Sequence, residues 1–238
     1  MEPLNIFIFA LQPADRAWVE QTTDLLYSHN ARPNVLPPSP LANGSALGND
    51  GSPGAATIVG ISAASSSKAT PVGNQDSLIL GSNGDREDDT PGFLVSIQAG
   101  ATDDITPAEG QLTSDGVNWM QQDAGPSMAS PLIYDDSIYI LQGRGGTISC
   151  YDAKTGSPRY EGERLKGARQ FWASPWGYDG KVFCLDQNGT TFVVEAGDKL
   201  NLLATNKIKG RFWSSPAMSE GGILLRGTER IYCIKNES

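Results

Sequence analysis

A short motif recurs along this chain and constrains its fold more than any other feature. The motif is a small residue, then Ser or Thr, then a proline, and its prolines are Pro71, Pro131, Pro175 and Pro216. The last three prolines are 44 and 41 residues apart, and the first interval is 60 residues. One four-stranded blade of a β-propeller takes roughly 40 to 45 residues. The spacing therefore predicts a repeat protein whose first unit carries an insertion.

Each unit reads as short β-rich runs separated by polar turns. Asp179-Gly180 is a strong signal for a type I′ hairpin turn, because both central residues of that turn need positive φ. In the first unit, two polar loops at 81–89 and 101–115 account for the longer interval. The predicted strands are 78–80, 93–97 and 117–120 in the first unit, 131–134, 137–141, 147–151 and 158–161 in the second, 174–178, 181–185 and 190–195 in the third, and 216–218, 223–226 and 230–234 in the last.

The residues before the repeats have a different composition. Residues 14–29 could form one short helix, and residues 30–54 are so rich in Pro, Gly, Ser and Asn that a linker or a disordered insertion is expected. A β-rich run at 56–61 indicates that regular secondary structure begins again there. We therefore predict an irregular segment over 1–54 and an all-β domain over 55–238, a partial β-propeller of about three to four four-stranded blades.

The charge and the hydropathy pattern exclude some classes of partner. Lys and Arg number 18 against 27 Asp and Glu, a net charge of −9, which argues against binding to nucleic acid or to an anionic membrane surface. No run approaches the roughly 20 apolar residues of a membrane span. The apolar run at 6–11 is short and lacks a preceding Lys or Arg, so it makes a poor signal peptide.

Residues suited to catalysis or metal binding are scarce. The one histidine, His29, precedes the repeats, so no Ser-His-Asp triad can lie within them. Cys150, Cys184 and Cys233 are too far apart in sequence for the usual zinc spacings, and we expect them to fill the core as small apolar residues. The acidic run in 81–89 lacks the alternating ligands of a calcium loop and is predicted to be a solvated loop. We predict no catalytic residue and no metal site.

Tryptophan and arginine recur near the motif, and two roles are open for them. Trp172 and Trp213, one per repeat, are expected to pack between neighbouring blades. The alternative is a partner-binding surface, since Trp and Arg are enriched in binding hot spots. The candidate residues for that surface are Trp119, Arg144, Arg169, Trp172, Trp176, Arg211 and Trp213.

The repeats resemble the pyrroloquinoline-quinone-like β-propeller family, which includes quinoprotein dehydrogenases and the BamB-type outer-membrane assembly lipoproteins. The matching segments are 130–141, 150–156, 173–185 and 203–206. The Asp-Ala-Lys-Thr-Gly turn at 152–156, which follows an aromatic strand, is typical of these blades. The chain looks most like the C-terminal part of bacterial propeller proteins that are usually described only as repeat-containing.

This resemblance implies a function and a location. It favours a non-enzymatic scaffold or protein-interaction module, and the alternatives are a remnant of a quinoprotein oxidoreductase or a truncated product without activity of its own. Family rings close with seven or eight blades, so we expect either a fragment completed by missing blades or an open arc that docks on a protein partner. The adjacent cysteines and calcium ligands of the redox members have no counterpart here, so no cofactor is expected, and only the family name suggests pyrroloquinoline quinone. The resemblance implies a periplasmic or other extracytoplasmic location, while the poor signal peptide leaves the cytoplasm open.

Overall fold

A computed structural model describes residues 69–85, 90–102, 104–108, 110–142, 144–219 and 222–235. The chain divides into two units, Met1–Ala55 and Ala56–Ser238, and all described residues belong to the second. The predicted helix at 14–29, the linker at 30–54 and the β-run at 56–61 lie outside the described residues, as does most of the acidic part of the loop 81–89.

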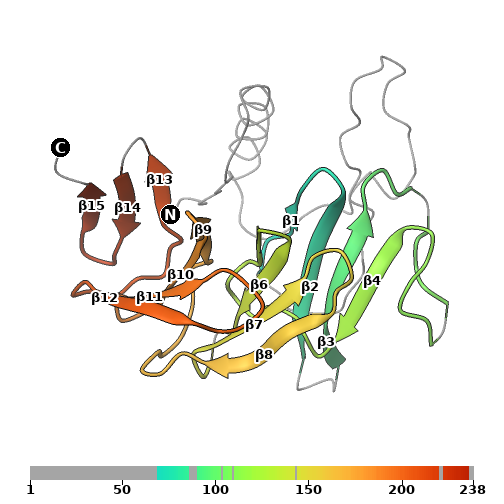
Figure 1. Cartoon of the computed structure of the whole chain (residues 1–238), viewed down its shortest axis with the longest axis horizontal. Coiled ribbons are helices and arrows are strands. Elements are labelled where there is room, and N and C mark those ends of the chain that lie inside the picture. Colours follow the sequence, from blue (N-terminus) through green and yellow to red (C-terminus); the bar gives the residue numbers. More distant parts are fainter. Residues whose placement is uncertain are drawn as a thin grey trace, which may run out of the picture. The chain divides into compact units, whose positions relative to one another are not determined.

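The described residues form four antiparallel sheets, one for each copy of the motif (Figure 1). Three sheets have four strands and the last has three, and in every sheet consecutive strands are neighbours. The bounds are β1 Val72–Gly73, β2 Ser77–Asp85, β3 Thr90–Gln98, β4 Val117–Gln122; β5 Leu132–Tyr134, β6 Ser137–Leu141, β7 Thr147–Asp152, β8 Pro158–Arg164; β9 Trp176–Tyr178, β10 Lys181–Leu185, β11 Thr190–Glu195, β12 Leu202–Lys207; and β13 Ala217–Ser219, β14 Gly222–Arg226, β15 Ile231–Lys235.

This topology confirms the predicted fold class, an all-β partial propeller with about three to four four-stranded blades. The predicted strands are all present, and most of their bounds agree within one or two residues. Asp179 and Gly180 have φ of 49° and 66°, as a type I′ turn requires. Asp135 and Asp136 have φ of 47° and 56°, so the second blade makes the same turn without glycine.

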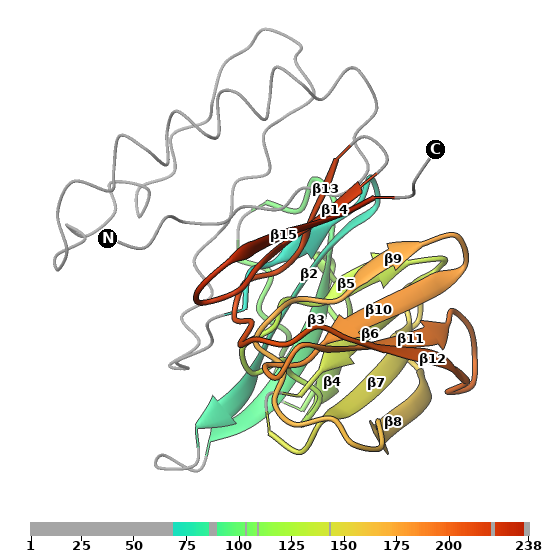
Figure 2. The ribbon, with the colours of Figure 1, turned by 90° about the vertical axis from the view of Figure 1, so that its left-hand side faces the viewer.

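Successive blades pack through two clusters of buried side chains. Ile79, Leu94 and Trp119 of the first blade pack against Ile138 and Ile140 of the second. The opposite side of β6 carries Tyr139 and Leu141, which pack against Val182, Cys184, Phe192 and Val194 of the third blade. Since side chains alternate along a strand, the second blade has one face toward the first blade and the other toward the third (Figure 2).

The repeated motif forms a ladder of hydrogen bonds from blade to blade, which we call the marker ladder. The N–H of Thr70 donates to the hydroxyl of Ser130 at 2.9 Å, and the N–H of Ser130 donates to the hydroxyl of Ser174 at 3.0 Å. The N–H of Ser174 donates in turn to the hydroxyl of Ser215 at 2.8 Å. The motif therefore recurs because the same joint is built between each pair of blades.

Removing one hydroxyl of the marker ladder should weaken one joint. Ser174→Ala leaves the N–H of Ser130 without its acceptor, and we expect the free energy of unfolding to fall by about 1 kcal/mol. Ser214→Ala is the matched control, because Ser214 is a neighbouring half-buried serine outside the ladder. Urea denaturation of both variants measures the difference, and equal stability of the two variants would contradict a role for the ladder.

Candidate functional site

The last blade leaves one face uncovered among the described residues. In β14 and β15, Leu224 lies opposite Cys233 and Arg226 lies opposite Ile231, so these four side chains share one face. Ile223, Leu225 and Ile234 lie on the opposite face, where Leu225 is 3% exposed and Ile234 is 44% exposed. We call the face of Leu224, Arg226, Ile231 and Cys233 the outward face. Ile231 is 73% exposed and Leu224 is 38% exposed.

The second blade shows what the same positions do when another blade follows. The strands β6 and β7 pair in the same register as β14 and β15. Tyr139 therefore corresponds to Leu224, Ile148 to Ile231 and Cys150 to Cys233. Tyr139, Ile148 and Cys150 are each 0% exposed. They lie in the cluster that packs against the third blade. The outward face therefore has the residues of a blade-packing surface, and no described blade covers it.

Two of the predicted partner-binding residues lie in the core. Trp119 is 5% exposed and its indole N–H donates to the carbonyl of Ala153 at 3.1 Å. Trp176 is 2% exposed and stacks on Phe183, with ring centroids 5.2 Å apart. Neither ring offers a surface to a partner in this fold, which confines the partner-binding prediction to the other residues of the set.

The prediction that Trp172 and Trp213 pack between blades is correct only in part. Their rings do contact each other, with centroids 6.4 Å apart. However, Trp213 is 55% exposed, so the prediction that it is a core residue is wrong. Phe171 and Phe212, one position earlier in each repeat, are the buried rings at 0% and 1% exposed. A shift of one residue reverses the direction of a side chain in an extended segment, and the sequence pattern did not set that register.

The three arginines of the set are exposed and lie in different blades. Arg144 is in the hairpin turn of the second blade, Arg169 precedes the third blade, and Arg211 precedes the fourth. Arg211 belongs to the same segment as Trp213. Partner binding by these arginines and by Trp172 and Trp213 stays a prediction. Leu224 and Ile231 were not predicted as site residues, although the alignment of the repeats indicates which positions face a following blade.

The three cysteines differ in their exposure. Cys150 and Cys184 are 0% exposed, which confirms them as core residues, and burial raises the pKa of both thiols. The same prediction is wrong for Cys233, which is exposed because no blade covers the outward face. The thiolate is the reactive form of cysteine, and burial keeps Cys150 and Cys184 protonated and out of reach. We therefore expect a thiol reagent such as Ellman's reagent to label only Cys233 in the native chain and all three cysteines in the unfolded chain. Labelling that persists in Cys233→Ser would contradict this assignment.

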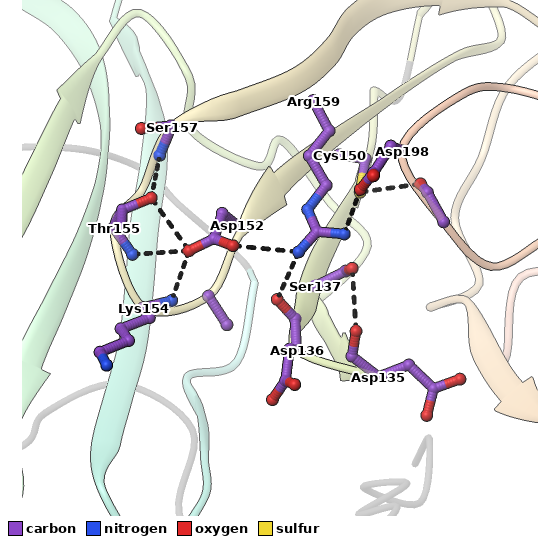
Figure 3. Close-up of polar contacts among 12 residues, drawn as sticks. Asp135, Asp136, Ser137, Cys150, Asp152, Lys154, Thr155, Ser157, Arg159 and Asp198 are labelled. Carbon is purple, nitrogen blue, oxygen red and sulfur yellow. Dashed lines mark hydrogen bonds and ion pairs between the residues drawn. The ribbon is translucent and has the colours of Figure 1, made fainter.

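Arg159 connects the second and third blades at their surface (Figure 3). Its guanidinium donates to Asp152 on β7 at 3.0 Å and to Asp198 in the turn after β11. The Asp152 carboxylate also accepts the N–H and the hydroxyl of Thr155 at 2.8 and 2.9 Å. These contacts fix the Asp-Ala-Lys-Thr-Gly turn, and Arg159 engages both carboxylates.

Asp152 should make stability depend on pH. Its hydrogen bonds from the backbone and hydroxyl of Thr155, with the contact to Arg159, lower the pKa of the Asp152 carboxyl. Its ionised form therefore stabilises the fold above the unfolded pKa of about 3.9, and this contribution is lost as the pH falls toward the folded pKa. We expect Asp152→Asn to be less stable than the wild type at pH 6, with a difference that shrinks between about pH 5 and 3. Thermal unfolding across this range checks it, and a constant difference would contradict it.

The described residues contain no cluster of metal-ligating side chains. No group of three His, Cys, Asp or Glu side chains converges among them. The cysteines are Cys150 on β7, Cys184 on β10 and Cys233 on β15, so no adjacent pair exists. The absence of a cofactor stays a prediction.

In the part of the chain that the structure describes, no helix has the length and hydropathy to cross a membrane. No protein-family model and no curated protein matches the sequence.

Several solved structures are similar to this chain at low identity. The computationally designed Ika4 protein is 11% identical with a TM-score of 0.48, covering 72% of this chain and 91% of its own. BamB from Moraxella catarrhalis is 10% identical with a TM-score of 0.35, covering 70% and 57%. The glutaminyl cyclase of Myxococcus xanthus is 13% identical with a TM-score of 0.41, covering 71% and 65%. The chain thus spans less than two thirds of the length of the two natural proteins.

Proposed function

We propose that the chain is a non-enzymatic scaffold that binds a protein through the outward face of its last blade. One observation carries this proposal: Leu224 and Ile231 are 38% and 73% exposed, whereas Tyr139 and Ile148 at the same repeat positions are buried. Exposed apolar side chains that share one sheet face are typical of interaction sites. Trp213, which lies just before the last blade, is also 55% exposed, and its ring contacts that of Trp172.

Ile231→Glu tests this role with little risk to the fold, because the Ile231 side chain is already mostly solvated. Leu203→Glu is the matched control, since Leu203 is 47% exposed on β12, the outermost strand of the third blade. The wild-type chain is immobilised, a captured protein is identified and purified, and its Kd is measured for the three chains. We expect Ile231→Glu to weaken binding by roughly tenfold or more and Leu203→Glu to leave it unchanged. Equal binding to both variants would contradict the proposal.

The alternative of a redox remnant has its own test. The chain is titrated with pyrroloquinoline quinone and Ca²⁺ while the absorbance of the quinone is followed. Stoichiometric binding would favour the oxidoreductase alternative over the scaffold. For the scaffold we propose no resident cofactor, and on the family resemblance alone we propose an extracytoplasmic location.

A further inference from the structure

We propose that the outward face binds the first blade of a second copy of this chain, and that two copies close head to tail into one ring. This inference rests on the proposed function and names its partner. Three observations carry it: the free end of the marker ladder, the apolar outward face, and the opposite charge of the two end blades.

The marker ladder has a donor left at one end and an acceptor left at the other. At each joint, the N–H of one motif serine or threonine donates to the hydroxyl of the next motif. Within the described residues, the N–H of Ser215 donates to no hydroxyl of another motif. The hydroxyl of Thr70, in the first motif, is exposed and accepts no N–H from a described residue. A second copy would supply Thr70 as the next acceptor for Ser215, which repeats the joint found between the other blades.

The first blade offers an apolar face where the outward face would pack. Ile79 and Leu94 face the second blade, so Leu78, Leu80 and Phe93 alternate with them onto the opposite face. These three side chains are half-buried, whereas Val95 on the same face is buried. The contact with Leu224 and Ile231 would therefore centre on the half-buried residues and on Thr70.

The charges of the end blades are complementary. Residues 69–123 include ten Asp and Glu but only one Arg. Asp76 and Asp123 are among the exposed acidic residues. Between residues 208 and 238, which follow β12, there are five Lys and Arg and three Glu, and Arg226 lies on the outward face. Such an arrangement favours contact of the last blade with the first and opposes contact of two last blades with each other.

Head-to-tail contacts produce a closed ring when the rotation from copy to copy allows it. Two copies with four sheets each give eight blades, within the typical range of about 4 to 8 blades in propellers. Closure would also remove the uncovered face from solvent in both copies. The proposed species is therefore a dimer with two identical junctions.

Sedimentation equilibrium of the full chain over a range of concentrations tests this inference. We expect a monomer–dimer equilibrium without larger species, and a Kd that rises roughly tenfold between 0.05 and 0.5 M NaCl. Thr70→Val removes one acceptor at each of the two junctions, so Kd should rise by about tenfold to a hundredfold. Ile231→Glu should abolish the dimer, and Leu203→Glu should leave it intact. Circular dichroism confirms that each variant is folded.

Labelling of Cys233 provides a second readout, since this thiol lies on the outward face and Cys150 and Cys184 are buried. Its labelling rate should fall as the chain concentration passes through Kd. A wild-type chain that stays monomeric, an open polymer, or a dimer weakened by Ile231→Glu but unaffected by Thr70→Val would each overturn the inference. A monomer that still binds another protein through the outward face would overturn only the proposal that the partner is a second copy of this chain. The proposed scaffold function would remain.

Discussion

Replacing Gly156 with alanine is expected to lower the free energy of unfolding by about 2 to 5 kcal/mol. Gly156 ends the Asp-Ala-Lys-Thr-Gly turn with φ of 72°, a conformation that costs an L-residue with a Cβ roughly 1 to 2 kcal/mol. A Cβ at this position would also overlap the indole of Trp119, with only 2.6 Å to Cε3. Trp119 is 5% exposed and its N–H is bonded to Ala153, so the ring has little freedom to move away.

A second glycine in the same blade separates the cost of the positive φ from the cost of the overlap with Trp119. Gly162 has φ of 61°, but a Cβ there would have no atom within 4 Å. Gly162→Ala should therefore cost only the backbone term of about 1 kcal/mol. Urea denaturation followed by tryptophan fluorescence measures both variants. If the two substitutions cost the same, the contact between Trp119 and the turn of the next blade does not limit the packing of the first two blades.

Asp186→Ala should have the second largest effect, a loss of about 3 kcal/mol. Asp186 follows β10 and is 1% exposed. One carboxylate oxygen accepts the N–H groups of Asn188 and Thr190 at 2.9 and 2.8 Å, which closes the hairpin turn to β11. The other oxygen accepts the N–H of Arg169 at 3.2 Å, which ties the turn to the segment that precedes the third blade. Alanine leaves all three donors without their acceptor.

Asp186→Asn is the matched control for this prediction. The amide keeps one acceptor oxygen for Asn188 and Thr190 and places an NH₂ group near the N–H of Arg169. We expect a stability between those of the wild type and Asp186→Ala, measured by chemical denaturation at neutral pH. A loss below about 1 kcal/mol for alanine would mean that water replaces the carboxylate at little cost.

The strands of this fold were predictable because their signals are local. The motif prolines mark where each blade begins, and turn residues such as Asp179-Gly180 set where each hairpin reverses. The acceptor role of Ser130 and Ser174 was not predicted, although both lie in the motif. The recurrence of the motif gives the spacings of 60 and 44 positions, but it does not show which group of each motif donates and which accepts.

The candidate site was harder to predict because exposure depends on what packs against a blade. Cys150 and Cys233 occupy equivalent positions in similar strands, yet one is buried and the other is exposed. Phe212 and Trp213 are adjacent large aromatics, and only the first points into the core. In each pair the residue type is similar and the neighbour differs, so composition and spacing cannot distinguish them.

Amide hydrogen exchange at the motif residues tests the central claim most directly: the motif joins successive blades, and its last copy is an open binding end. The exchange of the Ser130, Ser174 and Ser215 amides is followed by NMR in the dilute, monomeric chain and again with the outward face occupied. We predict slow exchange at Ser130 and Ser174 throughout, because their N–H groups donate to the next blade. Ser215 should exchange fast in the free chain and slowly once a partner covers the last blade. Slow exchange of Ser215 in the free monomer, or exchange of Ser174 as fast as that of Ser215, would contradict the account.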